Sequence, residues 1–248
     1  MKQFLPLILF IVAFLFCTFN INANSNLTDH TSSNDHPDKI KCMTCPVGDI
    51  LLTLQSEVTN FTVNYPGCTA LLGSLIIGPS ENIVNLDGLN GITSINNSLV
   101  ILDNILLENI VGLMNVTTIG AGGGAIDITN NNLLSQIDLS NASAPVLFSV
   151  RIDRDSALTD LMLPPDITTG GFISIFGNPL LANITEFDNL TQLTNYLQIH
   201  GTAVSALPLF QNLTNVFGIA IEDNPLICLL YTSPSPRDLS TSRMPSSA

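Results

Sequence analysis

The chain has 248 residues, with 7 Lys and Arg against 20 Asp and Glu, which gives a formal net charge of -13. This acidic balance argues against nucleic acid as a partner, because sequence-tolerant binding to nucleic acid needs a basic surface. Hydrophobic residues make up 46% and charged residues 11%, a combination that intrinsically disordered chains do not have. Trp is absent and only 3 His are present, so few side chains are available for catalysis.

The first 23 residues have the pattern of a secretory signal peptide. Lys2 supplies a positive charge, Phe4–Phe16 is an apolar run, and Ala23 fits a cleavage point. The run is shorter than the roughly 20 residues that span a bilayer, and an uncleaved signal anchor is the alternative. Residues 24–44 are polar, so we expect a flexible leader there. The protein is therefore expected to be secreted or at the cell surface, where disulfides form.

Residues 228–248 differ in character from the rest of the chain. Cys228–Asp238 resembles the translation of a transposase-type sequencing adapter, and Ser242–Ala248 resembles the adjoining flow-cell primer. A genuine linker rich in Pro and Ser is the alternative. We expect this tail to be an unstructured artefact, and the natural protein to be truncated at this point.

Between these ends, a pair of apolar residues separated by one position recurs along the chain. The second members of successive pairs lie 24, 27, 24, 23, 24 and 22 residues apart, and Ile50–Leu52 fits as an earlier, first pair. Each pair is a period-2 signal that places both side chains on one face of a short strand. The other pairs are Leu75–Ile77, Leu99–Ile101, Ile126–Ile128, Val150–Ile152, Ile173–Ile175, Leu197–Ile199 and Ile219–Ile221.

A short repeat with one strand cannot bury its own apolar face, whereas stacked repeats bury it between neighbours. The sequence therefore predicts an all-β fold, a right-handed parallel β-solenoid of about eight coils of about 24 residues each. A helical bundle would need a 3.6-residue period, which is missing. A leucine-rich-repeat horseshoe would place its Asn after an LxxLxL strand, which differs from the pattern here.

A polar side chain follows most pairs, three positions after the second apolar residue. Asn and Asp tolerate tight turns and bond nearby backbone, so stacked turns would align these side chains in a ladder. The ladder positions are Ser80, Asn104, Asn131, Asp155, Asn178, Thr202 and Asn224. An apolar residue follows about two positions later, at Leu106, Leu133, Leu180, Val204 and Leu226.

Residues 45–68 differ from the later repeats and are expected to cap the first coil. Asp49–Thr53 is predicted to be a strand and Ser56–Tyr65 one short helix that begins with Ser56 as its cap. Val58 and Phe61 would face inward.

A disulfide between Cys45 and Cys68 would close a loop of about 23 residues, which is worth about 3 kcal/mol in the chain-entropy model. The partner of Cys42 stays open, because Cys42 could bond Cys68 instead or a cysteine of the lost C-terminus.

Four short motifs resemble the opening of receptor L-domain-like proteins, namely Cys45-Pro-x-Gly-Asp, Tyr65-Pro-Gly-Cys68, Gly73-Ser-Leu75-Ile-Ile77 and Leu86-Asp-Gly-Leu89. The likeness covers residues 45–227 and weakens at Gly122–Ser140 and Asp153–Gly171, where we expect a bulge or a loop. The same solenoid forms the ligand-binding lobes of the insulin and epidermal growth factor receptors. The resemblance implies a non-catalytic binding or adhesion module that recognises a protein or glycan.

Two segments invite a metal or catalytic interpretation. Gly120–Asp127 resembles a calcium-binding GGxGxD repeat, but Ala125 stands where Gly is required, so a flexible turn is favoured. Asp153 and Asp155 resemble a paired carboxylate, but nearby Arg151 offers an ion pair across strands. We therefore expect no metal, no cofactor and no catalytic residue.

A polysaccharide-active solenoid enzyme would need clustered acids or bases on one strand face. The outward positions supply no such cluster; they are Ile76, Val100, Asp127, Arg151, Ser174, Gln198 and Ala220.

Strand parity predicts aromatic side chains on the outer face of two neighbouring coils. Phe172 would stack on Tyr196, and Phe176 on His200. Exposed aromatic groups on a flat face suit contact with a sugar or a protein, so these four are the predicted ligand-binding residues. The alternative is that Phe172 and Phe176 lie at strand ends and turn inward.

N-x-S/T sequons begin at eight positions and would mark exposed glycan sites in a eukaryotic protein. They are Asn26, Asn60, Asn96, Asn115, Asn141, Asn183, Asn189 and Asn212.

A structural spacer or stalk of a larger surface protein is the alternative function. Membrane contact is expected only through the signal sequence or a missing C-terminal anchor, and the sequence sets no oligomeric state.

Overall fold

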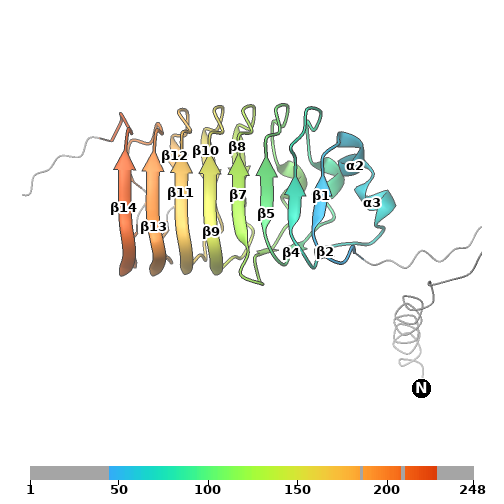
Figure 1. Ribbon diagram of the computed structural model, residues 1–248, viewed down its shortest axis with the longest axis horizontal. Helices are drawn as coiled ribbons and strands as arrows, with labels where there is room; N and C mark the ends of the chain where they lie inside the picture. Colours follow the sequence, from blue (N-terminus) through green and yellow to red (C-terminus); the bar gives the residue numbers. More distant parts are fainter. Residues whose placement is uncertain (1–44, 185–186, 208–209, 228–248) are drawn as a thin grey trace, which may run out of the picture. The chain divides into compact units, whose positions relative to one another are not determined.

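The computed structural model describes residues 45–184, 187–207 and 210–227. They wind as an all-β parallel solenoid (Figure 1), whose largest sheet runs in the order β1-β3-β5-β7-β9-β11-β13-β14. These strands are β1 (Ile50–Leu52), β3 (Leu75–Ile77), β5 (Leu99–Leu102), β7 (Ala125–Thr129), β9 (Val146–Asp153), β11 (Thr169–Phe176), β13 (Gln192–His200) and β14 (Asn215–Glu222). The predicted signal peptide, the polar leader and the adapter-like tail lie outside the described residues.

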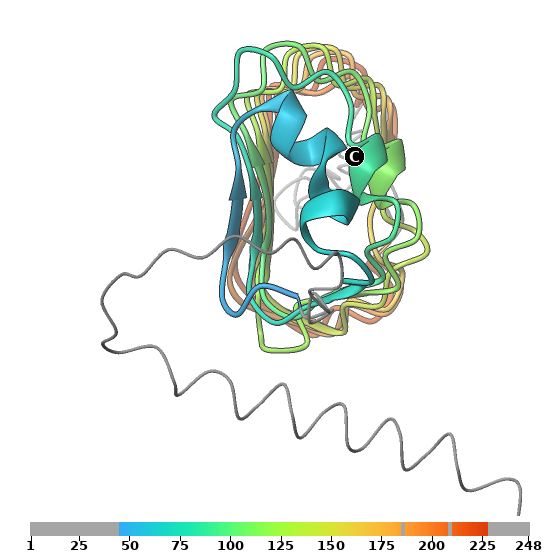
Figure 2. The same ribbon diagram turned by 90° about the vertical axis from the view of Figure 1, so that its right-hand side faces the viewer.

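Two smaller parallel sheets of three strands lie outside the long sheet, in the order β2-β4-β6 in the N-terminal coils and β12-β10-β8 in later coils. Viewed along the solenoid axis, the long sheet forms one wall and short helical turns lie on the wall opposite (Figure 2). The smaller elements are β2 (Ala70–Leu71), β4 (Ser94–Ile95), β6 (Thr118–Ile119), β8 (Gln136–Asp138), β10 (Asp160–Met162), β12 (Asn183–Ile184) and the 3-10 helices η2 (Asp87–Leu89) and η3 (Val111–Leu113).

The predicted apolar pairs lie in register along the long sheet, each opposite its equivalent in the next coil. In the column that contains Ile175, side chains from Ile77 to Ile199 are fully buried. The last pair differs, because Ile219 on β14 is 57% exposed. No described strand lies beyond β14, so one side of that pair has no neighbour.

The predicted polar ladder is confirmed in atomic detail. The backbone N–H of Asn131 donates to the side-chain oxygen of Asp155, and that of Asp155 donates to Asn178, at 2.7 and 2.8 Å. The Asn178 amide also donates back to the carbonyl oxygen of Ile152, at 2.8 Å. These buried groups would cost free energy if they were unpaired, so the ladder both satisfies the turns and fixes the register between coils.

The N-terminal segment contains two short helices instead of the single helix that the sequence predicts. They are α2 (Gln55–Thr59) and α3 (Phe61–Asn64), interrupted at Asn60. The inward positions are confirmed, since Val58 and Phe61 are buried. The assignment of Ser56 as the helix cap is wrong, because the first helix starts after Leu54 and the Glu57 carboxylate accepts from the backbone N–H of Leu54.

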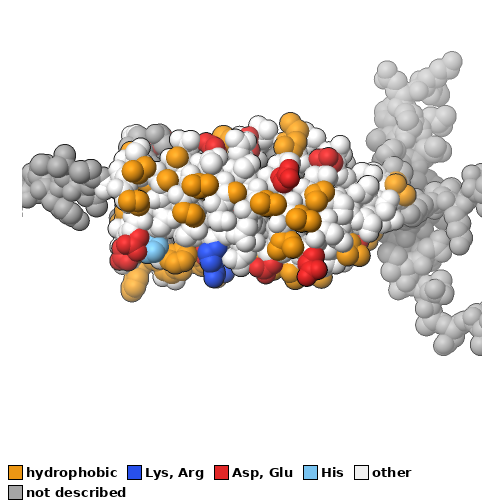
Figure 3. Space-filling view, turned by 90° about the horizontal axis from the view of Figure 1, so that it is seen from above, with side chains coloured by type: hydrophobic (Ala, Val, Ile, Leu, Met, Phe, Trp, Pro, Cys, Tyr) orange, Lys and Arg blue, Asp and Glu red, His pale blue; other side chains and the backbone are white. Residues whose placement is uncertain are grey.

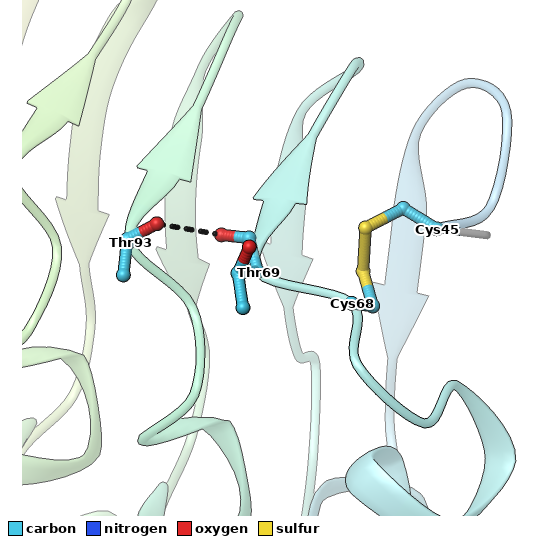
Figure 4. The surroundings of a disulfide bond; sticks show 4 residues. All are labelled: Cys45, Cys68, Thr69 and Thr93. Carbon is cyan, nitrogen blue, oxygen red and sulfur yellow. Dashed lines mark hydrogen bonds between the residues drawn. A yellow bond between two sulfur atoms is a disulfide. The ribbon is translucent and has the colours of Figure 1, made fainter. Parts of the chain in front are cut away.

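The predicted disulfide between Cys45 and Cys68 is present, with Cα atoms 4.8 Å apart. Figure 4 shows it directly before Thr69, whose carbonyl oxygen accepts a hydrogen bond from the Thr93 hydroxyl of the next coil, at 3.1 Å. The same bond recurs between Thr117 and Thr93 at 3.0 Å. The disulfide therefore fixes the N-terminal residues to the start of a second inter-coil ladder. Cys42 lies outside the described residues.

The two coils in which the repeat weakens contain irregular connections. In the longer one, the backbone N–H of Gly123 donates to the carbonyl oxygen of Gly120 in a tight turn before β7. In the other, the pairing of β11 with β13 contains a register shift between Gly170 and Ile173.

The residue before each ladder position from Asn104 to Asn224 adopts the left-handed conformation, which favours Gly and Asn. Arg154 has φ 58°, whereas Gly177 and Gly201 occupy the equivalent place in the next two coils. We expect Arg154→Gly to raise the free energy of unfolding by about 0.5–1 kcal/mol in urea melts, because the Cβ strain is removed. Arg154→Ala is the control, since it removes the same charge and keeps the Cβ; an equal gain in both variants would contradict this explanation.

Candidate binding face

The outer face of the long sheet has the predicted aromatic pairs at its β11–β13 step. The Phe172 and Tyr196 rings stack with centroids 5.2 Å apart, and the Phe176 and His200 rings with centroids 4.7 Å apart. The two phenylalanines are half-buried and flank the outward-facing Ser174. The predicted stacking of Phe172 on Tyr196 and of Phe176 on His200 is therefore confirmed, with both phenylalanines half-buried instead of exposed.

Charged side chains lie beside the aromatic pairs. The Arg151 guanidinium lies 3.6 Å from Asp127 and 3.8 Å from Asp153, as the strand register predicts. Its central carbon also lies 5.8 Å from the centroid of the Phe172 ring, a cation–π contact that sequence reasoning missed. Because Arg151 is exposed, these contacts position the side chain more than they stabilise the fold.

A polar strip separates the two aromatic pairs. The Ser174 hydroxyl lies 3.1 Å from the Asp153 carboxylate and 3.5 Å from the Gln198 side-chain oxygen. Burial raises the pKa of Asp153, while the hydrogen bond from Ser174 and the charge of Arg151 act in the opposite direction. Because Ser174 is buried, its hydroxyl orders the Asp153 and Gln198 side chains between the apolar rings.

Acidic groups border the His200 end of this face. His200 Nε2 lies 2.9 Å from the Asp223 carboxylate, so Nε2 has the proton that donates to Asp223. Figure 3, seen from above, shows the histidine against acidic side chains near one end of the solenoid.

Asp155 does not belong to the ion-pair cluster, contrary to the paired-carboxylate comparison. It occupies the buried ladder, where one oxygen accepts from Asn131 and the other has no hydrogen-bond partner. Burial raises the pKa of Asp155 to about 7. The sequence signal for this buried carboxyl group was an Asp at a ladder position where most coils have Asn.

The predicted glycan sites lie away from the outer face of the long sheet. Six of the seven sequon asparagines within the described residues are exposed, and Asn96 is half-buried. None lies in a strand of the long sheet. Five of these asparagines also donate to carbonyl oxygens of the preceding coil, which gives them a structural role; they are Asn96, Asn115, Asn141, Asn189 and Asn212.

Other kinds of site have little support in the part of the chain that the structure describes. No group of three or more His, Cys, Asp or Glu side chains there is arranged to hold a metal ion. Within the same residues, no helix is both long and apolar enough to cross a membrane.

Comparisons with protein-family models, with curated proteins and with solved structures each returned no match.

Proposed function

We propose that this protein is a non-catalytic binding or adhesion module that recognises a protein or glycan at a surface through the outer face of its long sheet. The observation that carries the proposal is the pair of stacked aromatic contacts, Phe172 with Tyr196 and Phe176 with His200. Aromatic side chains held rigidly on a flat sheet supply contact area at a small cost in conformational entropy.

The distribution of sequons supports the same face. If the chain is secreted and glycosylated, the glycans would project from the turns and from the smaller sheets. The long sheet would then be the broad face left open to a partner.

The proposal includes the finer features of the fold and the origin of the chain. The solenoid is a right-handed, receptor L-domain-like stack of about eight coils, closed at its N-terminus by the helices at Val58 and Phe61. A signal peptide directs the chain outside the cell, and residues 228–248 are the adapter-derived tail of a truncated natural protein. The paired cysteines support an oxidising compartment.

Binding of the full chain to arrays of glycans and of cell-surface proteins tests this function. We expect binding that falls at least about tenfold when Phe172, Phe176, Tyr196 and His200 are all replaced by Ala. Tyr65→Ala is the matched control, because Tyr65 is 36% exposed, like Tyr196, and also contacts a neighbouring ring. A spacer would bind nothing in either array, and turnover of uronic-acid polymers would reinstate the enzyme alternative.

A further inference from the structure

The aromatic pair at Tyr196 belongs to a longer column of stacked groups. Arg151 lies over the Phe172 ring from the β9 side, and Tyr196 lies against its other side with 16° between the ring planes. Since these groups come from successive strands, the second face of the Tyr196 ring points toward β14. The residue opposite Tyr196 on β14 is Gly218, which has no side chain to continue the column.

Small residues on β14 turn this gap into a ledge. Gly218 and Ala220 lie opposite Tyr196 and Gln198. A Cβ added at Gly218 would meet nothing within 4 Å, and Tyr196 is 36% exposed. The larger side chains of β13 therefore stand above the small residues of β14, and we call the surface over Gly218 and Ala220, beside Tyr196 and Gln198, the ledge. Glu222, opposite His200, lies at its edge.

We propose that this ledge binds the pyranose ring of an uncharged sugar, which lies flat against the face of Tyr196 that points toward β14. The proposal rests on the proposed function and names its ligand class. The C–H face of a pyranose is apolar and packs on an aromatic ring, while its hydroxyls donate and accept hydrogen bonds. Gln198 offers both a donor and an acceptor, and the Glu222 carboxylate accepts.

Charge selects among the sugars. Glu222 and the exposed Asp223 border the ledge, and the whole chain has a net charge of -13. An anionic sugar would therefore be repelled, whereas a neutral hexose meets acceptors that its hydroxyl groups can satisfy.

The test uses calorimetric titration of the full chain with methyl glucopyranoside, methyl galactopyranoside and methyl mannopyranoside, and with methyl glucuronide as the anionic comparison. We expect one or more neutral glycosides to bind, and the glucuronide to bind at least about tenfold more weakly than the best of them. Tyr196→Ala should weaken binding of the neutral sugar about tenfold or more, because the stacking surface is lost.

Gly218→Phe separates a filled ledge from a damaged fold. The position has space for a side chain, so the variant should melt like the wild type while its ring extends the stack and blocks the sugar. Tyr65→Ala should bind the sugar like the wild type.

The outcomes separate this proposal from the proposed function. Surface binding that both Tyr196→Ala and Gly218→Phe leave unchanged would overturn the ledge and keep the binding module. Surface binding by a wild type that binds none of the three neutral glycosides would overturn the ligand class. A wild type that binds neither surfaces nor sugars would overturn both.

Discussion

Ile175→Ala is expected to lower the free energy of unfolding by about 2–5 kcal/mol, through lost burial and a cavity. Ile175 is fully buried and lies in register between Ile152 and Ile199. Both neighbours belong to strands that are hydrogen-bonded to further coils, so the surroundings have little freedom to collapse into the space. Urea melts of the wild type and the variant measure the loss directly.

Two further variants calibrate this result. Gln198→Ala removes an outward side chain one position before Ile199, and its effect should stay within about 0.5 kcal/mol. Asn178→Ala should rank between the other two, at about 1–3 kcal/mol, because it removes two buried ladder bonds. If Gln198→Ala proved the most damaging, the inward and outward faces would be exchanged and the ledge beside Tyr196 would be lost.

The repeating part of the fold was predictable because each coil repeats one physical solution. An apolar–x–apolar pair has only one way to bury both side chains in a stack, so the register of Ile175 followed from spacing alone. The ladder followed for a similar reason, since a buried turn must pair its backbone groups and Asn can do so from both ends of its amide.

Where two adjacent residues are both apolar, the periodicity of the repeat could not decide which of them is buried. The repeat indicated Leu106 and Leu133 as the apolar residues after the ladder, but both are partly exposed. The adjacent residues, Leu107 and Leu134, are fully buried instead. Adjacent leucines fit the pattern equally well, and only the path of the turn selects between them.

The candidate site shows the same division. Parity placed Phe172 on Tyr196, because alternation along one strand and stacking between strands are both regular. The ledge could not be anticipated, because it depends on the missing side chain of Gly218 and on the pairing of Gly218 with Tyr196 across β13 and β14. The partly exposed Ile219 was likewise unforeseen, since burial of a pair depends on a neighbouring coil on each side.

Asp155→Asn is expected to remove most of the dependence of stability on pH between about pH 5 and about pH 8. In the wild type, burial raises the pKa of Asp155 from 3.8 to about 7, with smaller contributions from the Asp153 and Asp127 carboxylates. Hydrogen bonds from Asn131 oppose that rise. The charged groups in this part of the fold also include Arg151 and the adjacent Arg154.

The sign of this pH dependence follows from the folded state, which binds the Asp155 proton more tightly than the unfolded state does. A carboxyl group with a higher pKa in the folded state contributes its full stability below the unfolded pKa of 3.8, and this contribution is lost as the pH rises through about 7. The loss is at most about 4 kcal/mol. Burial raises the pKa of Asp153 too, so a smaller slope of the same sign remains in the variant.

The ladder explains why Asn should be the better residue above neutral pH. Asp155 accepts from Asn131 with one oxygen, and its other oxygen is buried without a partner. In the next coil, the equivalent atom of Asn178 is an amide nitrogen that donates to the carbonyl oxygen of Ile152. A protonated Asp155 supplies such a donor only below about pH 7, whereas Asn supplies it at every pH.

Urea melts at about pH 5 and about pH 8 should show a wild type that loses stability and a variant that changes little. Asp138→Asn is the control for overall charge, because Asp138 is exposed and lies outside the ladder. It should keep the wild-type slope. Hydrogen bonds lower the pKa of Asp160, which acts with the opposite sign but below this pH window. A wild-type slope that persists in Asp155→Asn would show that this buried carboxyl does not titrate with folding.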